Sequence, residues 1–467
     1  MNASSHYHTA IIGAGMSGLA AGIRLAHFGR RVVILERHNA PGGLNGFYSL
    51  NGRPFDVGLH AMTNFVPPGV RGTPLGKILR QLRVERDELG LRPQKQSRVT
   101  FGAAAPVSLR FSNDIGLLEA EIAREFPSQA DAFRRLAADV PGLEAAPPAG
   151  LSARQIIRRR ITDPLLADML LLPLLYYGSP TPGDMDAAQF AIMFRALYLE
   201  GFARPFEGVR QIIRVLLQKY REAGGERRMK TPVKAILHDT ARATALVLEN
   251  GETLTADHIL STAGAPETGR LLRPPPDAEH PVGRLSFAET ITLLPKLPPA
   301  WTGDTIVFFN ETQNPVHEPA AGLVDTRSGV ICFPNNFDYG GRDLPEGVFR
   351  CTCLANHALW DKLPPGEYHL QKQAALARLQ TSARRFLPPV DDAALAPLAT
   401  DMFTPKTIVR FTGRLNGAIY GSPRKIRDGR TFLSNLHLCG TDQGYLGITG
   451  ALLGGITIAN QRILSRP

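Results

Sequence analysis

The chain has 467 residues, of which 43% are hydrophobic and 20% charged, and it carries a formal net charge of +11. These proportions are ordinary for a soluble globular protein, and the length suffices for two or three domains. No stretch reaches the roughly 20 apolar residues of a membrane-spanning helix, and no basic tract with interleaved aromatics supports nucleic-acid binding. The positive charge is compatible with an anionic membrane surface, an acidic substrate or a general Arg-rich bias.

The N-terminal residues and the cysteines bear on the cellular compartment. Residues 1–8 are polar and lead directly into a strand, so we expect no secretory signal. Cys332, Cys351, Cys353 and Cys439 form no C-x-x-C pair and no zinc-ligand cluster. We therefore expect reduced thiols, no bound metal and a cytoplasmic protein.

A compact βαβ unit is predicted at the start of the chain. Residues 9–12 form a short apolar strand, 19–28 an Ala/Leu-rich helix and 32–35 the next strand. The turn between the first strand and the helix, residues 13–18, is a G-x-G-x-x-G in the context that the dinucleotide-binding motif requires. Glu36 ends the second strand 18 residues after the last glycine, where the motif places an acid that accepts from ribose hydroxyls.

The positions of this turn have separate physical roles. Gly13 permits the tight turn, Gly15 lets a pyrophosphate approach the backbone, and Gly18 lets the helix pack on the strand. The N–H groups at the helix start, around Met16 and Ser17, face the phosphates with the positive end of the helix dipole. The pattern predicts a bound dinucleotide, and the alternative is a purely structural glycine turn.

The middle of the chain alternates between helical and strand patterns. Helices are expected over residues 113–126 with Asn113 as N-cap, from 128 onward, and over 164–177, 209–223 and 368–386. Strands are expected at residues 245–249, 252–254, 289–294, 305–309, 329–333 and 348–354. Asn250-Gly251 predicts a hairpin turn, and the later strands lack crossover helices, which predicts a largely antiparallel sheet. A glycine-rich tail from residue 404 ends in a small-residue helix at 450–463.

The segments after the second strand resemble those of a known family. Arg37 follows the acidic residue, Gly42 and Gly43 form a G-G turn, and residues 55–58 are Phe-Asp-Val-Gly. With these motifs the chain resembles the flavin amine-oxidase superfamily and, within it, the phytoene desaturase and carotenoid isomerase group.

The resemblance covers most of the chain. Residues 257–263 resemble the strand that returns under the flavin, 404–421 the desaturase signature and 438–451 the closing flavin motif. It implies FAD as the cofactor. The residues that the resemblance and the glycine motif assign to FAD are Gly13, Gly15, Met16, Ser17, Gly18, Glu36, Arg37, Gly42, Gly43, Leu44, Val233, Gly440, Thr441, Asp442, Gly447, Ile448 and Thr449.

Two departures from the family pattern concern these assignments. Leu44 stands where an Arg or Lys commonly follows the G-G turn, which removes one candidate phosphate partner. Thr441 stands where an acidic residue commonly follows Gly440, and Asp442 comes one position later. Either side chain could hold the ribityl hydroxyl.

The fold class implied is α/β: a Rossmann-like FAD-binding domain with an inserted α+β substrate domain of mixed or antiparallel sheet plus helices. We expect the FAD-binding domain to be discontinuous and to comprise residues 1–74, 206–274 and 401–467. The substrate-binding domain then comprises a helical insert at 75–205 and a sheet-plus-helix insert at 275–400. The oligomeric state is left open.

A long hydrophobic substrate would need an apolar tunnel with few charges. Candidate lining residues are Leu165, Leu166, Met169, Leu170, Leu171, Leu172, Leu174, Leu175, Tyr176 and Tyr177, with Phe190, Ile192, Met193, Phe194, Leu197 and Tyr198 as a second face. The alternative is that these helices are packed core. The neighbouring basic run of Arg154, Arg158, Arg159 and Arg160 suggests docking on an anionic membrane, such as the inner face of the cell membrane, and its alternative is a solvated helix face.

The resemblance places His60 near the flavin ring. Its pKa is ordinarily near neutrality, so it is a candidate base for the proton lost in desaturation. The alternative is a hydrogen-bonded His that packs beside the flavin. Thr63, Asn64 and Tyr445 are further candidates to face the ring.

The leading hypothesis is an FAD-dependent oxidoreductase that removes a hydride and a proton from an allylic CH₂–CH₂ unit of a polyisoprenoid. Relatives that isomerise or saturate double bonds are alternatives with the same site. A flavin amine or porphyrinogen-type oxidase is a second alternative, for which Tyr420 and Tyr445 could form an aromatic sandwich. A third is a lipid-binding escort of prenylated GTPases that has lost flavin, which the intact glycines and Glu36 disfavour.

Overall fold

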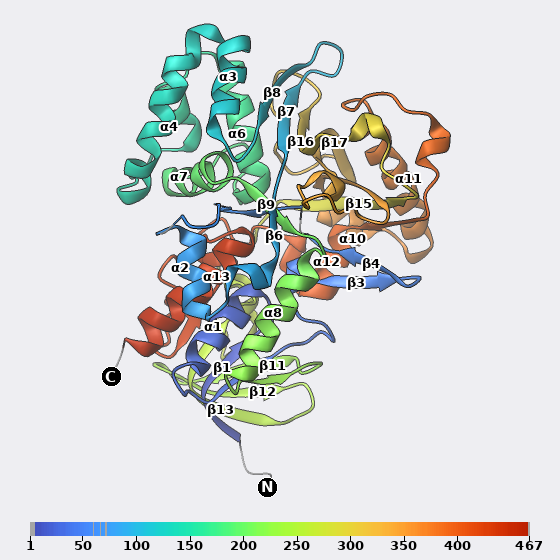
Figure 1. Cartoon of the computed structure of the whole chain (residues 1–467). Coiled ribbons are helices and arrows are strands. Elements are labelled where there is room, and N and C mark those ends of the chain that lie inside the picture. The colour runs from blue at the N-terminus through green and yellow to red at the C-terminus, as the bar shows by residue number, and fades with distance from the viewer. Residues whose placement is uncertain (1–4, 59, 66, 71, 466–467) are drawn as a thin grey trace.

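Two large β-sheets organise the chain, which the computed structural model describes at residues 5–58, 60–65, 67–70 and 72–465. An eight-stranded sheet lies low in Figure 1 and a seven-stranded sheet lies high, with a group of helices beside the latter. The first four residues, on which the expected absence of a secretory signal partly rests, lie outside the described ranges.

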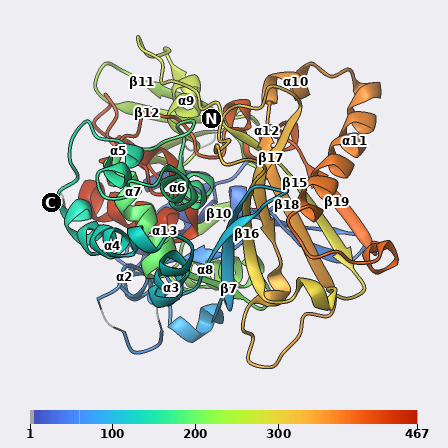
Figure 2. The same cartoon turned by 90° about the horizontal axis from the view of Figure 1, so that it is seen from above.

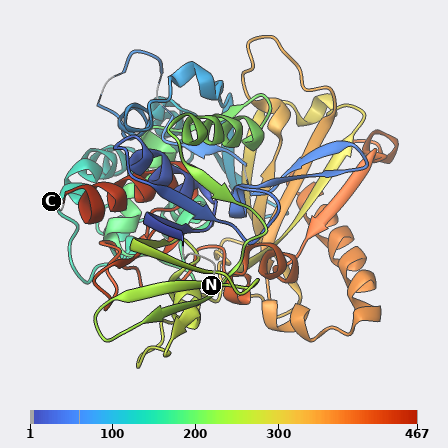
Figure 3. The same ribbon diagram turned by 90° about the horizontal axis from the view of Figure 1, so that it is seen from below.

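The eight-stranded sheet is assembled from segments that are far apart in the sequence. Its order is β10 (Glu226–Arg228), β2 (Val32–Leu35), β1 (Ser5–Ile12), β13 (Thr253–Ser261), β12 (Ala243–Leu248), β11 (Val233–His238) and β14 (Leu272–Arg273), with β20 (Leu436–Leu438) paired to β13. β1 runs parallel to β2 and β13, whereas β11, β12 and β13 pair antiparallel, which confirms the predicted hairpin. Figure 3 shows the N-terminal strands beside β11–β13.

Alternation of side chains along these strands gives the sheet two apolar faces. Ile11 and Ile34 belong to the core that includes α1 (Met16–Ala26), α2 (Pro74–Leu82), α8 (Val209–Glu222) and α13 (Gly447–Ile458). Ala10 and Val33 belong to a separate core with side chains of β11 and β12. The parallel strands and their covering helices confirm the predicted Rossmann-like α/β class.

The seven-stranded sheet is antiparallel except between two strands. Its order is β19 (Ala399–Phe403), β15 (Ser286–Leu294), β18 (Gly347–Ala355), β17 (Val324–Cys332), β16 (Asp304–Asn310), β7 (Gln96–Phe101) and β8 (Val107–Phe111). β16 and β7 run parallel, and the other neighbours pair antiparallel. The four strands predicted between residues 289 and 354 are confirmed.

One expectation about this sheet is wrong. Residues 75–205 were expected as a helical insert, but β7 and β8 lie in this region and extend the antiparallel sheet. Residues 107–111 alternate Val, Leu and Phe with Ser and Arg, which is the period of a strand with one buried face.

Both faces of the seven-stranded sheet are covered by helices. Ile306 and Phe308 of β16 join the core of the helices that precede residue 200, and Val307 and Phe309 join the core under α11 (Pro365–Arg384). Figure 2 shows the two helical layers on opposite sides of the sheet. The helices of the first layer are α3 (Ile115–Glu125), α4 (Ala130–Ala145), α5 (Ala153–Arg158), α6 (Pro164–Gly178) and α7 (Ala187–Phe194).

The N-cap of α3 and the start of the C-terminal helix differ from the prediction. Asp114, not Asn113, caps α3 by accepting from the Gly116 N–H. The Asn113 side chain instead bonds the backbone of Phe202. The C-terminal helix begins at Gly447, three residues before the predicted start, and continues as a π-helical turn over Ala459–Leu464.

Shorter elements join these layers. They are the hairpin β3 (Phe47–Leu50) and β4 (Arg53–Asp56), the small sheet of β5 (Met62–Thr63), β9 (Phe202–Pro205) and β6 (Leu91–Pro93), and the helices α9 (Ala265–Leu271), α10 (His357–Lys362) and α12 (Pro405–Thr412). Within the described residues, no helix is long and apolar enough to cross a bilayer. All four cysteines are buried and unpaired.

Candidate functional site

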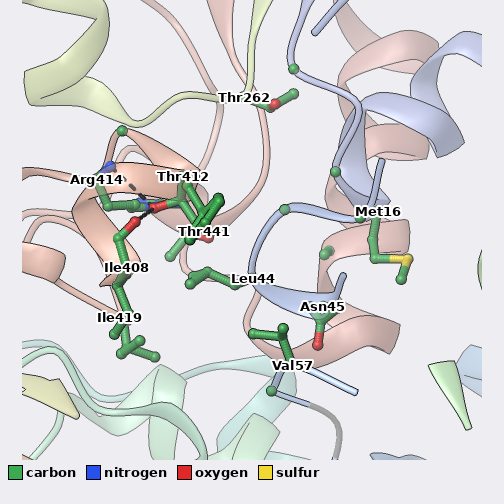
Figure 4. A pocket seen from close by; sticks show the side chains of 18 of the residues that line it. Met16, Leu44, Asn45, Val57, Thr262, Ile408, Thr412, Arg414, Ile419 and Thr441 are labelled. Atoms are coloured by element: carbon green, nitrogen blue, oxygen red, sulfur yellow. Dashed lines mark hydrogen bonds between the residues drawn. The ribbon is translucent and has the colours of Figure 1, made fainter. Parts of the chain in front are cut away.

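A cavity of about 790 Å³ is lined by residues of both large sheets and of both ends of the chain. Figure 4 shows part of its wall, with side chains from the first glycine turn, from residues 408–419 and from Thr441 turned toward one space. The predicted FAD residues that line it are Gly13, Gly15, Met16, Ser17, Glu36, Arg37, Gly42, Gly43, Leu44, Val233, Thr441, Gly447 and Ile448. His60 lines it as well.

The first glycine turn is shaped to leave room for a ligand. Gly13 has φ of +103°, a conformation that favours glycine. A Cβ on Gly18 would lie 2.1 Å from the Gly13 carbonyl oxygen, so Gly18 lets the helix pack on the turn. A Cβ on Gly15 would meet no protein atom within 4 Å, so the space above Gly15 is open to the cavity.

Glu36 is held in place at the end of β2 by backbone N–H groups. Its Oε2 accepts from Ala14 N at 2.8 Å and its Oε1 from His38 N at 2.8 Å. Each carboxylate oxygen has lone pairs left for a further donor. The side chain is therefore fixed beside the glycine turn with capacity to accept hydrogen bonds from ribose hydroxyls.

Two neighbouring residues of the segment 438–451 have different surroundings: one lines the cavity and the other is bound to the surrounding backbone. Thr441 lines the cavity, and its hydroxyl accepts from Arg414 Nη2 at 2.8 Å. Asp442 does not line it, because its Oδ2 accepts from Ala265 N at 2.6 Å and its Oδ1 from Ser422 N at 2.9 Å. Of the two candidates for the ribityl contact, Thr441 is the one that lines the cavity, and the contact itself stays a prediction.

Three other predicted FAD residues, all described, do not line the cavity either. Gly18 packs under the turn, and a Cβ on Gly440 would lie 2.6 Å from Ser17 Oγ. The Thr449 hydroxyl donates to the Thr63 carbonyl at 2.9 Å. These residues support the wall of the cavity, and Gly447 and Ile448 at the start of α13 form part of it.

Several polar residues that line the cavity were not predicted from the sequence. Arg414, Thr262 and Glu267 line the cavity, and Arg414 and Thr262 appear in Figure 4. Arg414 lies within the segment that resembles the desaturase signature, but nothing in that resemblance pointed to its side chain. Arg414 brings a positive charge to the cavity wall, whereas Leu44 stands where relatives commonly have an Arg or Lys.

An apolar wall closes the part of the cavity that faces the seven-stranded sheet. We call it the aromatic end, and it comprises Tyr176, Tyr177, Phe287, Val330, Ile419 and Tyr420. Phe287 stacks on Tyr176 and meets Tyr420 edge to face, each at 5.8 Å between ring centroids. The Tyr420 hydroxyl donates to the Tyr176 carbonyl.

The expectation that the Leu-rich helix lines a tunnel is wrong for most of its residues. Among the residues lining the cavity, only Tyr176 and Tyr177 come from α6, and none comes from residues 190–198. Apart from Asp168, α6 is apolar around most of its circumference and lies inside the helical core. The alternative of packed core helices holds for these leucines.

Two polar residues expected near the ring are engaged elsewhere. The Thr63 carbonyl accepts from Thr449, and the Asn64 side chain donates to Glu200 at 2.6 Å. Neither residue lines the cavity, whereas Tyr445 does.

His60 is part of a buried charged cluster at the cavity wall. Its Nε2 lies 3.1 Å from Glu289 Oε1 and 3.1 Å from Thr352 Oγ1. Arg350 pairs with the same carboxylate, and both Arg350 and Glu289 are at most 2% exposed. Arg350 and His60 hold the pKa of Glu289 down at about 2, against the effect of burial. Burial lowers the pKa of His60, so the imidazole is neutral at pH 7.

The basic run near α6 is partly engaged within the protein. Arg154 pairs with Asp168, and Arg160 pairs with Asp139 at 2.9 Å, whereas Arg158 and Arg159 are exposed. Docking of this run on a membrane stays a prediction, as does the cytoplasmic location. Across the described ranges no group of three or more His, Cys, Asp or Glu side chains is arranged to hold a metal ion.

The cavity fits an elongated dinucleotide. Open space lies over Gly15, an anchored carboxylate lies at Glu36, and the first turn of α13 contributes Gly447 and Ile448. Val233 lines the cavity on the side of the eight-stranded sheet, and the aromatic end lines it on the side of the seven-stranded sheet. A ligand held at the glycine turn can therefore extend to the His60 cluster, which lines the same cavity.

Comparison with known proteins gives consistent matches. The profile of the flavin containing amine oxidoreductase family matches residues 16–462. The prolycopene isomerase of Arabidopsis thaliana is 23% identical over 90% of this chain and 75% of its own length. The hydroxyneurosporene desaturase of Cereibacter sphaeroides is 25% identical over 88% of this chain and 86% of its own. The crystal structure of an oxidoreductase from Methanosarcina mazei superposes with a TM-score of 0.68 at 15% identity, over 97% and 100% of the two chains.

Proposed function

The chain belongs to the flavin-containing amine oxidoreductase family, and from this premise we propose that it is a desaturase-type enzyme acting on a long hydrophobic, polyisoprenoid or carotenoid-like substrate. It is an FAD-dependent oxidoreductase. The observation that carries the proposal is the aromatic end of the cavity, where Tyr176, Phe287 and Tyr420 contact one another. Such a wall suits a hydrocarbon chain, and the names of relatives in the desaturase and isomerase group support the same class.

In this proposal the cofactor and the protein divide the work. FAD, when bound, supplies the acceptor for a hydride. Glu36, Thr441 and the start of α13 hold and orient the dinucleotide, and the aromatic end binds the hydrocarbon and excludes water. His60 lines the cavity wall, and in this proposal it takes up the proton released with the hydride.

The test is the absorption spectrum of the FAD-loaded protein under anaerobic conditions. Incubation with phytoene or a squalene-type polyene in liposomes is expected to bleach the oxidised-flavin bands, whereas amines leave them unchanged. Bleaching by amines but not by polyenes would support the oxidase alternative instead. A protein that takes up no flavin even after reconstitution would contradict the FAD assignment itself.

Isomerisation is a second candidate, because the prolycopene isomerase relative covers 90% of this chain. The two activities differ in electron balance: a desaturation reduces one flavin per double bond, and an isomerisation leaves the flavin state unchanged. Chromatography of the polyene after incubation with protein whose flavin was chemically reduced beforehand separates them. New geometric isomers without a change in the number of double bonds would favour the isomerase.

A further inference from the structure

The strand register brings a carboxylate and a hydroxyl to the same nitrogen of His60. Glu289 on β15 and Thr352 on β18 are direct cross-strand partners, and both side chains approach His60 Nε2 at 3.1 Å. Nδ1 makes no hydrogen bond within the described part of the chain, and His60 lines the cavity. Nε2 is thus engaged by two side chains that also line the cavity, and Nδ1 is the ring nitrogen without a hydrogen-bond partner among the described residues.

The charge state of Glu289 determines where the imidazole carries its proton. Glu289 is buried against Arg350 and stays ionised at neutral pH, so its oxygens only accept hydrogen bonds. A neutral imidazole that donates to Glu289 must carry its proton on Nε2. Nδ1 then bears the lone pair.

On the basis of the proposed function, we propose that Glu289 is a positioning residue that fixes His60 as the Nε2–H tautomer, so that Nδ1 accepts the proton lost from the substrate. One allylic C–H bond gives its hydrogen and electron pair to FAD as a hydride. The neighbouring C–H bond releases its proton to His60 Nδ1, and the electron pair of that bond becomes the new π bond. The resulting imidazolium lies beside the Glu289 carboxylate, which balances its charge.

The groups around His60 keep it available as a base. Burial is the largest influence on its pKa and lowers it; Glu289 raises it, and Arg350 and Arg204 lower it further. Arg204 is itself paired with Asp56, so the cluster contains two ion pairs and a neutral imidazole. The charged and titratable groups next to His60 are Glu289 on β15, Arg350 on β18, Arg204 on β9, Asp56 on β4 and Cys332 on β17.

The first experiment replaces the carboxylate by its neutral isostere. In Glu289→Gln the amide can donate to Nε2, which allows the Nδ1–H tautomer that cannot accept a proton. The anaerobic bleaching rate with polyene is expected to fall by about 10²-fold or more, with the affinity for FAD unchanged. Glu121→Gln is the matched control, because Glu121 is another buried carboxylate that pairs with Arg110 and does not line the cavity.

A second readout needs no substrate. In FAD-loaded protein labelled with ¹⁵N-histidine, the His60 resonances, identified by their loss in His60→Gln, are expected to show the Nε2–H tautomer. In Glu289→Gln they are expected to shift toward Nδ1–H. Thr352→Val removes the other contact to Nε2 and is expected to keep the wild-type tautomer.

The pH profile provides a third readout. Bleaching is expected to be lost as the pH falls through the pKa of His60, with a midpoint below 6.5 because burial lowers that pKa. Removal of the Glu289 charge is expected to move the midpoint lower still, because this carboxylate raises the pKa of His60. A purely structural role would lower the rate without moving the midpoint.

Several outcomes overturn the proposal. Wild-type bleaching in His60→Gln removes His60 as proton acceptor, and an unchanged tautomer in Glu289→Gln removes the positioning role. If Glu289→Gln fails to fold because Arg350 is left buried without its anion, Glu289→Gln combined with Arg350→Gln removes both charges and serves for the rate and tautomer measurements. If polyenes do not bleach the wild-type flavin, the proton-transfer step falls with the proposed function, whereas the tautomer assignment is decided by the NMR spectra alone.

Discussion

Gly15 and Gly18 lie in one turn, yet a methyl group added at each would meet different surroundings. At Gly18 it would lie 2.1 Å from a backbone oxygen, and at Gly15 it would meet no protein atom within 4 Å. The backbone at Gly15 is extended, with φ of −74°, so an alanine adds no strain there. The space at Gly15 is therefore open to a ligand, whereas Gly18 is required for the close packing of the helix on the turn.

The two substitutions are expected to separate binding from stability. Gly15→Ala leaves the melting temperature of the FAD-free protein unchanged but weakens FAD binding by about tenfold or more, because the methyl group occupies the space above the turn. Gly18→Ala lowers the free energy of unfolding by about 1–3 kcal/mol through overpacking. Flavin fluorescence titration and urea unfolding measure the two effects. Equal losses of stability in both variants would contradict this division.

His317 is expected to make the folded state sensitive to acid. It is 1% exposed, its ring meets Tyr176 edge to face, and burial lowers its pKa to about 4. Between pH 6.5 and 4 the unfolded chain binds this proton and the folded chain does not, so stability falls as the pH falls through this window. The loss is about 3 kcal/mol at most.

The matched variant is His317→Leu, which retains the backbone bond from Gly183 N to the carbonyl of residue 317 at 2.8 Å. Urea unfolding at several pH values is expected to show a smaller acid-induced loss of stability in this variant than in the wild type. Identical slopes in both proteins would show that His317 does not titrate in this way.

At the scale of elements, α6 is mainly a core helix, and among the residues lining the cavity it contributes Tyr176 and Tyr177 but none of its leucines. Leu172 is fully buried in the helical layer and does not line the cavity. Leu172→Ala is expected to lower the free energy of unfolding by about 2–5 kcal/mol, because it removes packed methyl groups and leaves a cavity. FAD affinity is expected to stay the same. Leu370→Ala on α11, where the side chain is 65% exposed, is the control that should change neither quantity.

Short sequence motifs predicted the turns and elements that depend only on neighbouring residues. The glycine turn and the Asn250-Gly251 hairpin are specified by residues next to one another in the sequence. β7 and β8 were missed although residues 107–111 alternate, because a short alternating segment between helical patterns is ambiguous.

Only the parts of the candidate site that belong to a sequence motif could be predicted. The glycine turn and Glu36 line the cavity as their motif implies. The partners of His60 could not be found in the same way, because Glu289 and Arg350 meet it only through the pairing of β15 with β18. That pairing joins residues about 60 positions apart and follows no local spacing rule.

At the scale of the whole molecule, the cofactor cavity connects parts that have separate cores. Its wall includes Gly15 in the first segment, Phe287 in the seven-stranded sheet and Ile448 in the last helix. FAD binds the folded chain and not the unfolded one, so it is expected to stabilise all of these parts together. The gain is about 2.7 kcal/mol at a free FAD concentration of 100 times Kd.

Thermal unfolding at increasing FAD concentrations measures this coupling. A single transition is expected to move upward with each addition, and Gly15→Ala is expected to need more FAD for the same shift. Two transitions, of which only one responds to FAD, would show that the two sheets unfold independently.

The closing elements of the cofactor wall also constrain how a cell makes this protein. β20 completes the pairing of β13, and α13 packs so closely on α1 that a Cβ on Gly455 would lie 2.2 Å from the Ser17 carbonyl. The glycine turn emerges from the ribosome before these partners do. FAD therefore meets a complete cavity wall only after β20 and α13 have been synthesised, and until then the apolar face of the first βαβ unit lacks the cover of α13.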